Sequence, residues 1–331
     1  MVVIPTLAAG EELRACLNSL QHQTWKNFQT VVVDNSGRGV VRALNMSQFG
    51  AEVLESPCNL GFGGAVNSAY CKTRPQFLAT LNDDATACPR WLESLLAAMQ
   101  SEQRVGMCAS RVLLAGENRL DSAGMLMSRD GSSKQRGHGE APDRFNVEDE
   151  ALLPSGSAAL YRGAMLEETG LFDESFFLYC EDTDLGLRAR WAGWRCRYVP
   201  EAIVSHHYSH SAGRSSPLKA FYVERNRLFL ATKNLPLADL LTAPFYSVAR
   251  YFWHTRYMAD GRGKAAEFRS MGNSAWRLAW YVLRAHLALV PAMPRLVRQR
   301  RLIRKRARLS SREFRELLRA HSISMRQVGA L

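Results

Sequence analysis

Short apolar runs alternate with amphipathic helical segments along the first 110 residues of the chain. The runs Val2–Pro5, Thr30–Asp34 and Phe77–Leu81 each have the length and apolar character of a buried strand. Between them Glu11–His22 carries leucines at helical spacing, and Pro89 opens a later helix. Strands separated by helical segments predict an α/β fold, in which a mostly parallel sheet is covered by helices on both faces.

Polar residues follow two of these runs directly. Asp34 ends one run, and Asn82, Asp83 and Asp84 follow another. Ligands of parallel sheets bind beyond the carboxyl ends of the strands. Oxygen side chains two residues apart can reach one hard cation, Mg²⁺ or Mn²⁺, which would neutralise a diphosphate. The simpler alternatives are an Asn/Asp turn and, for Asp34, a turn with a helix N-cap.

Three carboxylates, Glu181, Asp182 and Asp184, stand together after an aromatic and aliphatic run. Acids beside apolar surface cost free energy unless they are paired, bound to a metal or used in chemistry. Helical spacing continues from them to Gly193, so they mark a helix start where packing can hold a general base still. Capping of the first turn, with an i,i+4 pair between Asp184 and Arg188, explains this segment equally well.

Two further motifs carry polar chemistry. The stretch Asn59–Asn67 holds three glycines without the spacing of a dinucleotide fingerprint, so we expect a tight turn that lets backbone approach a ligand. His206 and His207 end a strand-like run, and either can complete a metal site. Adjacent histidines are more often structural or solvated than ligating.

The net charge of +12 is unevenly distributed. Residues 1–210 carry 19 Lys or Arg and 25 Asp or Glu, whereas residues 211–331 carry 24 and 6. The densest run, Arg295–Arg308, has eight basic residues and no acid. Basic, aromatic and amphipathic segments together favour an anionic membrane surface. A solvated helical bundle is the alternative, and a nucleic-acid partner is disfavoured because the first 210 residues are acidic overall and show no nucleic-acid fold signature.

Several motifs occur together in one order: VVIPT, VVVDNS, NLGFGGAVN, LNDDA, CEDTDLGLRARWAGW, VPEAIVSHH and ERNRLF. In this order they resemble family 2 glycosyltransferases, and the bacterial rhamnosyltransferase-like branch most. The resemblance covers residues 1–230 and implies a GT-A catalytic domain there. Residues 231–331 are then a helical, basic, membrane-associating region.

The resemblance also implies roles for individual residues. Asp182 would be the general base, and Asp84 with His206 would hold Mg²⁺ or Mn²⁺. The residues implied at the nucleotide-sugar donor are Pro5, Thr6, Asp34, Asn59, Gly61, Asn67, Asn82, Asp83, Arg225 and Asn226. The candidates on the acceptor side are Glu181, Phe177 and Trp194. One departure is that Asn82 takes the first position of the D-x-D pattern, where a carboxylate would be a stronger metal ligand.

The implied activity is inverting, metal-dependent transfer of a sugar from a nucleotide diphosphate to a lipid-linked or polysaccharide acceptor, in cell-surface glycan synthesis. The donor suggested by the branch is dTDP-rhamnose, with UDP- and GDP-sugars left open. The seven cysteines are scattered and contain no C-x-x-C, which predicts reduced thiols in a cytoplasmic protein, here peripheral at the inner face of the cell membrane. The alternative function is a catalytically inactive sugar-binding or membrane scaffold of the same fold.

Overall fold

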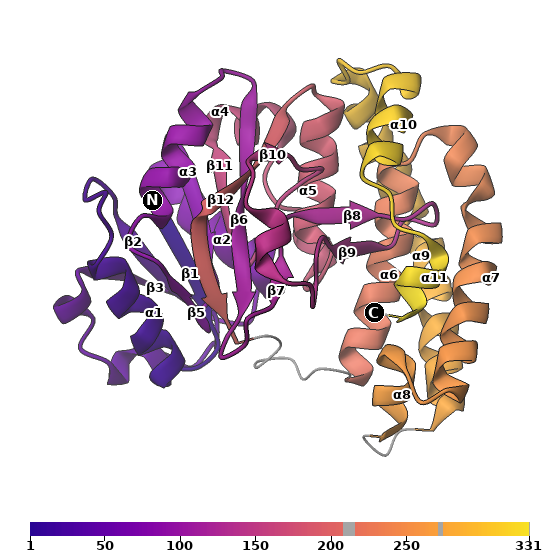
Figure 1. Cartoon of the computed structure of the whole chain (residues 1–331), viewed down its shortest axis with the longest axis horizontal. Helices are drawn as coiled ribbons and strands as arrows, with labels where there is room; N and C mark the ends of the chain where they lie inside the picture. The colour runs from indigo at the N-terminus through magenta and orange to yellow at the C-terminus, as the bar shows by residue number, and fades with distance from the viewer. Residues whose placement is uncertain (208–215, 271–273, 331) are drawn as a thin grey trace. The chain divides into compact units, whose positions relative to one another are not determined.

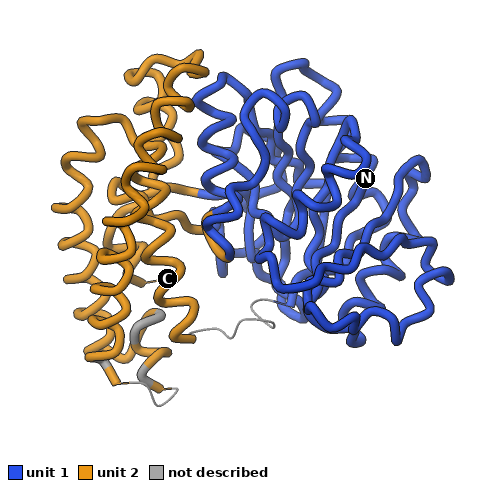
Figure 2. Tube along the Cα trace, turned by 180° about the vertical axis from the view of Figure 1, so that it is seen from behind, with its two compact units in different colours: residues 1–125, 135–177, 181–210 blue, residues 126–134, 178–180, 211–331 orange. Residues whose placement is uncertain are grey.

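A computed structural model describes residues 1–207, 216–270 and 274–330 (Figure 1). The chain separates into two compact units (Figure 2). Unit 1 comprises residues 1–125, 135–177 and 181–210, and unit 2 comprises residues 126–134, 178–180 and 211–331. The main division lies between residues 210 and 211, and two short segments from within residues 1–230 also belong to unit 2.

The large sheet runs in the order β10-β12-β6-β11-β4-β1-β2-β3, with β5 paired to β12 and β7 to β6. Its strands are β1 Val2–Thr6, β2 Thr30–Asp34, β3 Ala51–Glu55, β4 Phe77–Leu81, β5 Ala85–Ala87, β6 Val105–Leu114, β7 Leu120–Ser122, β10 Asp149–Glu150, β11 Ala158–Arg162 and β12 Arg195–His206. A small second sheet pairs β8 Met125–Met127 with β9 Ser133–Gln135. Strands β3, β2, β1 and β4 are parallel, but β11 is antiparallel to both β4 and β6, so the sheet is mixed.

Helices cover both faces of this sheet, as the alternation of elements predicts (Figure 1). In unit 1 they are α1 Glu11–Gln21, α2 Gly61–Thr73, α3 Trp91–Gln100, α4 Gly163–Thr169 and α5 Glu181–Trp191, with short 3₁₀ turns η1 Val40–Ala43, η2 Met46–Phe49, η3 Pro142–Phe145 and η4 Glu174–Phe176. Successive strand side chains point to opposite faces. Val2 and Ile4 accordingly pack in the core with α1 and α3, whereas Val3 packs in the core with α2, α4 and α5.

The glycine-rich stretch forms a helix instead of the predicted tight turn. Helix α2 begins at Gly61, whose φ is +73°, a conformation that favours glycine. A Cβ atom on Gly61 would lie 2.0 Å from the carbonyl oxygen of Phe177, and one on Gly63 would lie 2.8 Å from Cβ of Phe172. These glycines therefore let the start of α2 approach the 172–177 segment of the protein itself.

Unit 2 is helical. Its helices are α6 Pro217–Asn234, α7 Leu237–Ala259, α8 Gly263–Ser270, α9 Ala275–Lys305, α10 Ser311–Ala320 and α11 Met325–Ala330. In the part of the chain that the structure describes, no helix combines the length and the apolar character that crossing a bilayer requires.

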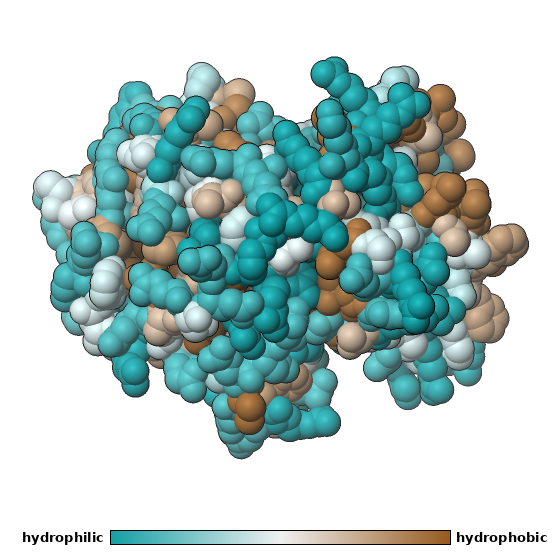
Figure 3. Space-filling model, turned by 90° about the horizontal axis from the view of Figure 1, so that it is seen from above, coloured by the Kyte–Doolittle hydropathy of each residue, from teal (hydrophilic) through white to brown (hydrophobic). Residues whose placement is uncertain are grey.

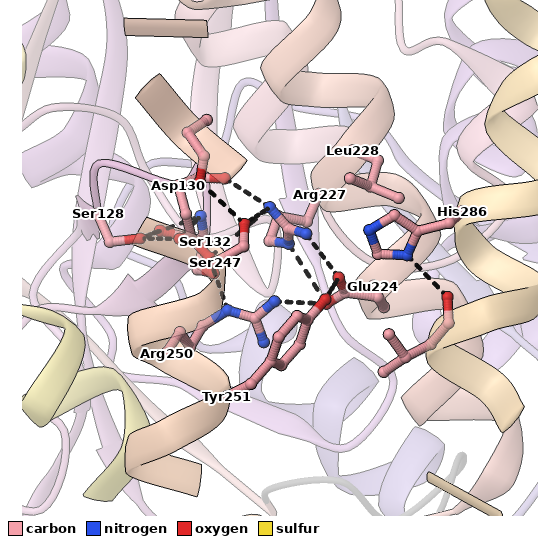
Figure 4. Close-up of polar contacts among 12 residues, drawn as sticks. Ser128, Asp130, Ser132, Glu224, Arg227, Leu228, Ser247, Arg250, Tyr251 and His286 are labelled. Carbon is pink, nitrogen blue, oxygen red and sulfur yellow. Dashed lines mark hydrogen bonds and ion pairs between the residues drawn. The ribbon is translucent and has the colours of Figure 1, made fainter. Parts of the chain in front are cut away.

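A buried charge network joins three segments of unit 2 (Figure 4). Arg250 of α7 donates to Asp130 at 2.6 Å and to Glu224 of α6 at 2.8 Å. Arg227 of α6 also donates to Glu224, and to the backbone carbonyl of Asp130 at 2.7 Å. Burial alone would raise the pKa of Glu224, but Arg250 and Arg227 outweigh it and hold that pKa far below its usual value. Two acids and two arginines thus compensate each other inside the unit.

Replacing Gly61 tests the close approach at the start of α2. A left-handed residue with a Cβ costs about 1–2 kcal/mol, and the contact with Phe177 adds to that cost. We expect Gly61→Ala to lower the free energy of unfolding by more than ~2 kcal/mol, measured by urea denaturation. Gly50→Ala is the matched control, because Gly50 has φ +62° and a Cβ atom added there would have nothing within 4 Å. Equal losses in the two variants would contradict the proposed contact.

Candidate functional site

The carboxyl ends of three neighbouring strands meet at one edge of the sheet. Thr6 at the end of β1 lies in register with Asp34 at the end of β2. The Thr6 hydroxyl donates to Oδ2 of Asp83, just beyond β4, at 2.6 Å. Thr6, Asp34 and Asp83 therefore lie at the same edge of the sheet, with Pro5 beside them in β1.

A second group of polar side chains surrounds His206, the last residue of β12. Its Nε2 lies 3.2 Å from Oδ1 of Asp84 and 3.1 Å from Nδ2 of Asn82. Its Nδ1 lies 2.8 Å from Oδ2 of Asp121 in β7. Antiparallel pairing of β5 with β12, which sets His206 opposite Ala85, brings the segment after β4 to this histidine.

The electrostatics of this group favour positive charge between the side chains. Burial alone would lower the pKa of His206, but hydrogen bonds and charge from Asp121 and Asp84 outweigh it and raise the pKa to about 9. Oδ1 of Asp84 is buried and makes no hydrogen bond of good geometry. Burial chiefly raises the pKa of the neighbouring Asp83 to about 6, against the hydrogen bond from Thr6.

Asp84 and His206 are suitable donors for a divalent cation. Asp121 accepts from Nδ1, which leaves Nε2 directed toward the orphaned oxygen of Asp84, and metal-binding histidines typically have such a carboxylate partner. Within residues 1–207, 216–270 and 274–330, no three His, Cys, Asp or Glu side chains are grouped closely enough to hold a metal ion by themselves. Further ligands for a cation here must come from Asn82, solvent or a bound diphosphate.

Sequence reasoning missed Asp121. It lies in a three-residue strand inside the 115–150 region, which has no clear periodicity, and it meets His206 across 85 positions of sequence. Its carboxylate also lies 3.1 Å from Nδ1 of His138. Its burial with Leu120 and Ser122 is seen only in the structure, so the sequence holds no clear signal for it.

Asp182 lies in the first turn of α5 and accepts hydrogen bonds from backbone. Gly156 N donates to its Oδ2 at 2.8 Å, and Thr183 N donates to its Oδ1 at 2.6 Å. Burial raises the pKa of Asp182, while these hydrogen bonds oppose the rise. The predicted start of a helix at the acid cluster is confirmed, and Gly193, with φ +77°, lies just beyond its end.

The segment that holds Asp182 also contacts β4. The Thr80 hydroxyl donates to the carbonyl of Gly156, and Asn82 N donates to the carbonyl of Ser157, both at 2.9 Å. Gly156 and Ser157 therefore lie between the candidate base and the strand end that carries Asn82. This shared backbone fixes the two halves of the candidate site relative to each other.

The other two acids of the cluster differ from Asp182. Asp184 accepts from Nε of Arg188 at 2.9 Å with both side chains buried, which confirms the predicted i,i+4 pair. Glu181 is buried, and its Oε2 makes no hydrogen bond. Burial, with Asp182 nearby, raises the pKa of Glu181 to about 8, so its carboxyl group is mostly neutral at pH 7.

The backbone just before the cluster is strained. Phe177, Tyr179 and Cys180 have φ values of +64°, +70° and +66°. Such conformations persist only where surrounding contacts enforce them, and they concentrate at functional sites. Within unit 2, Nδ2 of Asn226 donates to the carbonyls of Leu178 and Tyr179 at 2.8 and 2.7 Å.

The remaining donor candidates make contacts within the protein. Asp34 accepts from Ser36 through Oδ1 and from Val41 N through Oδ2, which is the turn given in the alternative for this residue, although the N-cap of η1 is Gly39. Asn59 accepts from Gly61 N, while Asn67 bonds the backbone of Phe172 and the carboxylate of Glu174. The Arg225 guanidinium donates to Asn226 and lies 4.6 Å from the ring centre of Tyr222. The contacts of these donor candidates with a nucleotide sugar stay predictions.

The structure does not bring Trp194 to this group. It precedes the first residue of β12, whereas His206 is the last, and a strand rises about 3.3 Å per residue. Trp194 is buried, donates to Glu168 at 3.0 Å and lies under the guanidinium of Arg104. Phe177 directly follows η4, and its backbone carbonyl accepts from Phe62 N at the start of α2.

Residues 1–170 match the family described as glycosyl transferase family 2. The chain belongs to this family. One relative, the N-acetylglucosaminyl-diphospho-decaprenol L-rhamnosyltransferase of Mycobacterium tuberculosis, is 30% identical over 266 residues, which cover 70% of this chain and 84% of the relative. The predicted family 2 membership and glycosyltransferase activity are thereby confirmed.

Two solved glycosyltransferases share the fold of this family 2 protein. Residues 1–349 of Staphylococcus aureus TarS, in complex with UDP, align with a TM-score of 0.52 at 16% identity, covering 95% of this chain and 90% of that one. GalNAc-T7 with UDP, GalNAc and Mn²⁺ aligns with a TM-score of 0.54 at 14% identity over 70% of this chain, which spans 50% of that protein. They confirm the predicted GT-A fold.

Replacing Asp184 tests how much the Asp184–Arg188 pair of α5 contributes to the stability of this family 2 protein. Removing one partner leaves the other charge buried, so we expect Asp184→Ala to lower the free energy of unfolding by about 3–5 kcal/mol. Glu316→Ala is the control, because its pair with Arg312 is exposed and such pairs contribute about 0–1 kcal/mol. Guanidinium titrations of both variants measure the difference. A loss for Asp184→Ala no larger than for the control would refute the structural role.

Proposed function

We propose that this protein is an inverting, metal-dependent glycosyltransferase that moves a sugar from a nucleotide diphosphate to a lipid-linked glycan acceptor. The observation that carries the proposal is the shared Gly156–Ser157 segment, which contacts both Asp182 and the strand end bearing Asn82. The name of the mycobacterial relative supports rhamnose as the sugar and a diphospho-decaprenol-linked acceptor. Such an acceptor suits a role in cell-surface glycan synthesis at the cytoplasmic face of the membrane.

Asp182 is the proposed general base. An acceptor hydroxyl has a pKa far above 7, so it must lose its proton during attack on the anomeric carbon. Burial raises the pKa of Asp182, which makes its carboxylate a better proton acceptor than an exposed aspartate. Hydrogen bonds from Gly156 and Thr183 hold the carboxylate in place. Direct attack by the acceptor inverts the anomeric configuration and needs no covalent enzyme intermediate.

Asp84 and His206 are the proposed cation ligands, and Asn82 lies beside them. Held by these residues, a divalent cation would neutralise the charge of the diphosphate leaving group. GalNAc-T7, which shares the fold, was solved with UDP and Mn²⁺, and this supports Mg²⁺ or Mn²⁺ as the cation here. Asp121 keeps the proton of His206 on Nδ1 and orients the ring.

Transfer assays with Asp182→Asn test the proposed base. The wild-type protein should transfer sugar from dTDP-rhamnose to a polyprenyl-diphosphate-linked N-acetylglucosamine when Mg²⁺ or Mn²⁺ is present, with UDP- and GDP-sugars assayed in parallel. Asp182→Asn should lower kcat by about 10²–10⁴-fold, since a positioned base contributes that much. Its binding of donor, followed as a rise in melting temperature, should stay unchanged.

Asp143→Asn serves as the control for this experiment, because Asp143 is an exposed aspartate of the same unit. It should transfer sugar at the wild-type rate. Undiminished turnover by Asp182→Asn would remove the base assignment. Absence of turnover by the wild-type protein with every donor would instead support the inactive scaffold.

Asp121→Asn tests the orientation of His206. Loss of such an outer carboxylate typically weakens metal binding by about 10–100-fold. We expect a shift of that size in the apparent Kd for Mn²⁺, measured by calorimetry with nucleoside diphosphate present. Asp143→Asn should bind Mn²⁺ as the wild type does. An unchanged Kd in a variant that melts like the wild type would show that Asp121 does not serve the cation.

A further inference from the structure

Exposed apolar side chains are concentrated in unit 2. Among the described residues, all but three of the large apolar side chains that are exposed belong to unit 2, and the exceptions are Leu7, Trp25 and Val147. Single exposed apolar residues are ordinary on a soluble protein, but contiguous groups mark surfaces that bind something. The exposed apolar side chains of unit 2 therefore indicate a binding surface, whereas the three of unit 1 do not.

Helix α7 carries one continuous apolar stripe. Its members are Leu237, Leu241, Phe245, Val248 and Phe252, which are 59–75% exposed. Their spacing of three and four residues places them on one face of the helix. The opposite face is buried, and there Arg250 joins the charge network with α6. The stripe on α7 therefore turns away from the interior of unit 2.

Helix α9 carries a second stripe with the same spacing. Its exposed members are Trp276, Trp280, Leu283, Leu287 and Val290. Further along α9, Arg300 donates to backbone carbonyls of α6 and of Leu235, so another face of α9 packs on α6. Figure 3 shows brown, apolar residues gathered on the side of unit 2 where Figure 1 draws α7.

The charge around these stripes is strongly positive. Helix α9 contains no acid, and Arg277, Arg284, Arg298 and Arg301 are exposed on it. The one acid of α7, Asp239, is paired with Arg315 of α10 at 2.9 Å. Residues 211–331 together carry 24 basic and 6 acidic side chains.

We propose that the stripes on α7 and α9 form a lipid-docking face, which lies in the headgroup region of an anionic bilayer. Apolar and aromatic side chains beside arginines suit that environment, because the former enter the acyl boundary while the latter meet lipid phosphates. A second copy of the chain fits less well, since it would bring two strongly basic units together. The inference rests on the proposed function in one respect: docking would place the enzyme at the bilayer that displays the lipid-linked acceptor.

Vesicle binding by the full chain tests this face. The protein should sediment with phosphatidylcholine vesicles that contain phosphatidylglycerol, bind vesicles of phosphatidylcholine alone much more weakly, and be released by high salt. Substituting three members of the α7 stripe, Leu241→Gln, Phe245→Gln and Val248→Gln, should weaken binding by about tenfold or more, because apolar burial contributes much of the affinity. The matched control, Trp25→Gln with Val147→Gln, removes exposed apolar side chains of unit 1 and should bind like the wild type.

A second measurement does not depend on the folding of the triple variant. Brominated anionic lipids should quench the tryptophan fluorescence of the wild-type protein, and Trp276→Phe with Trp280→Phe should remove most of that quenching. Equal sedimentation of the triple variant and the wild type would overturn the proposal. So would a concentration-dependent dimer, seen by light scattering, that the triple substitution dissociates.

Transfer to a water-soluble, short-chain acceptor separates this inference from the proposed function. The triple variant should keep the wild-type rate with that acceptor and lose rate only with acceptor embedded in vesicles. Vesicle binding without any transfer would leave the docking face standing and refute the enzyme. Transfer without vesicle binding would refute the docking face alone.

Discussion

The guanidinium of Arg188 is the contact on which the placement of the candidate base depends. It is buried and donates to the carbonyls of Thr169, Gly170 and Leu171 and to the carboxylate of Asp184. A planar donor with several fixed N–H groups suits such a set of acceptors better than a lysine would. The backbone after α4 is thereby attached to the helix that begins with the acid cluster. The first turn of α5 has little freedom to move, and Asp182 shares that restriction.

The groups around His206 and around Asp182 stabilise buried charge in different ways. Around His206, two carboxylates compete for one imidazole, which leaves an oxygen of Asp84 without a hydrogen bond and makes the group attractive to a cation. Around Asp182, backbone N–H groups stabilise one carboxylate while burial keeps Glu181 protonated near neutrality. The proposed glycosyl transfer requires both features, a cation site beside the diphosphate and a carboxylate placed to accept a proton.

Local sequence patterns predicted the strands in which nearly every residue is buried. The strands Thr30–Asp34 and Phe77–Leu81 have the predicted bounds, because a short apolar run bounded by polar residues fits little else. The three glycines at the start of α2 predicted a tight turn that lets backbone approach a ligand, whereas the structure shows a helix in which Gly61 and Gly63 allow close contact with Phe177 and Phe172. Asp121 was inaccessible to such reasoning, since its partner His206 is distant in sequence and the region around it lacks periodicity. The family motifs, in contrast, identified His206 and Asp84 together.

The interleaved connectivity of the two units limits how this protein can recombine with its relatives. Asp130 reaches the interior of unit 2 through the segment 126–134, although the chain on either side of that segment belongs to unit 1. A chimaera joined near residue 211 would pair Arg250 and Arg227 of one parent with the 126–134 segment of the other. Any mismatch there would leave buried charge uncompensated. Unit 2 is built from three separate segments of the chain, so exchanging it between family members requires all three to be replaced together. Substitutions in the basic helices are therefore constrained by the sequence of the short segments that lie within the first 180 residues.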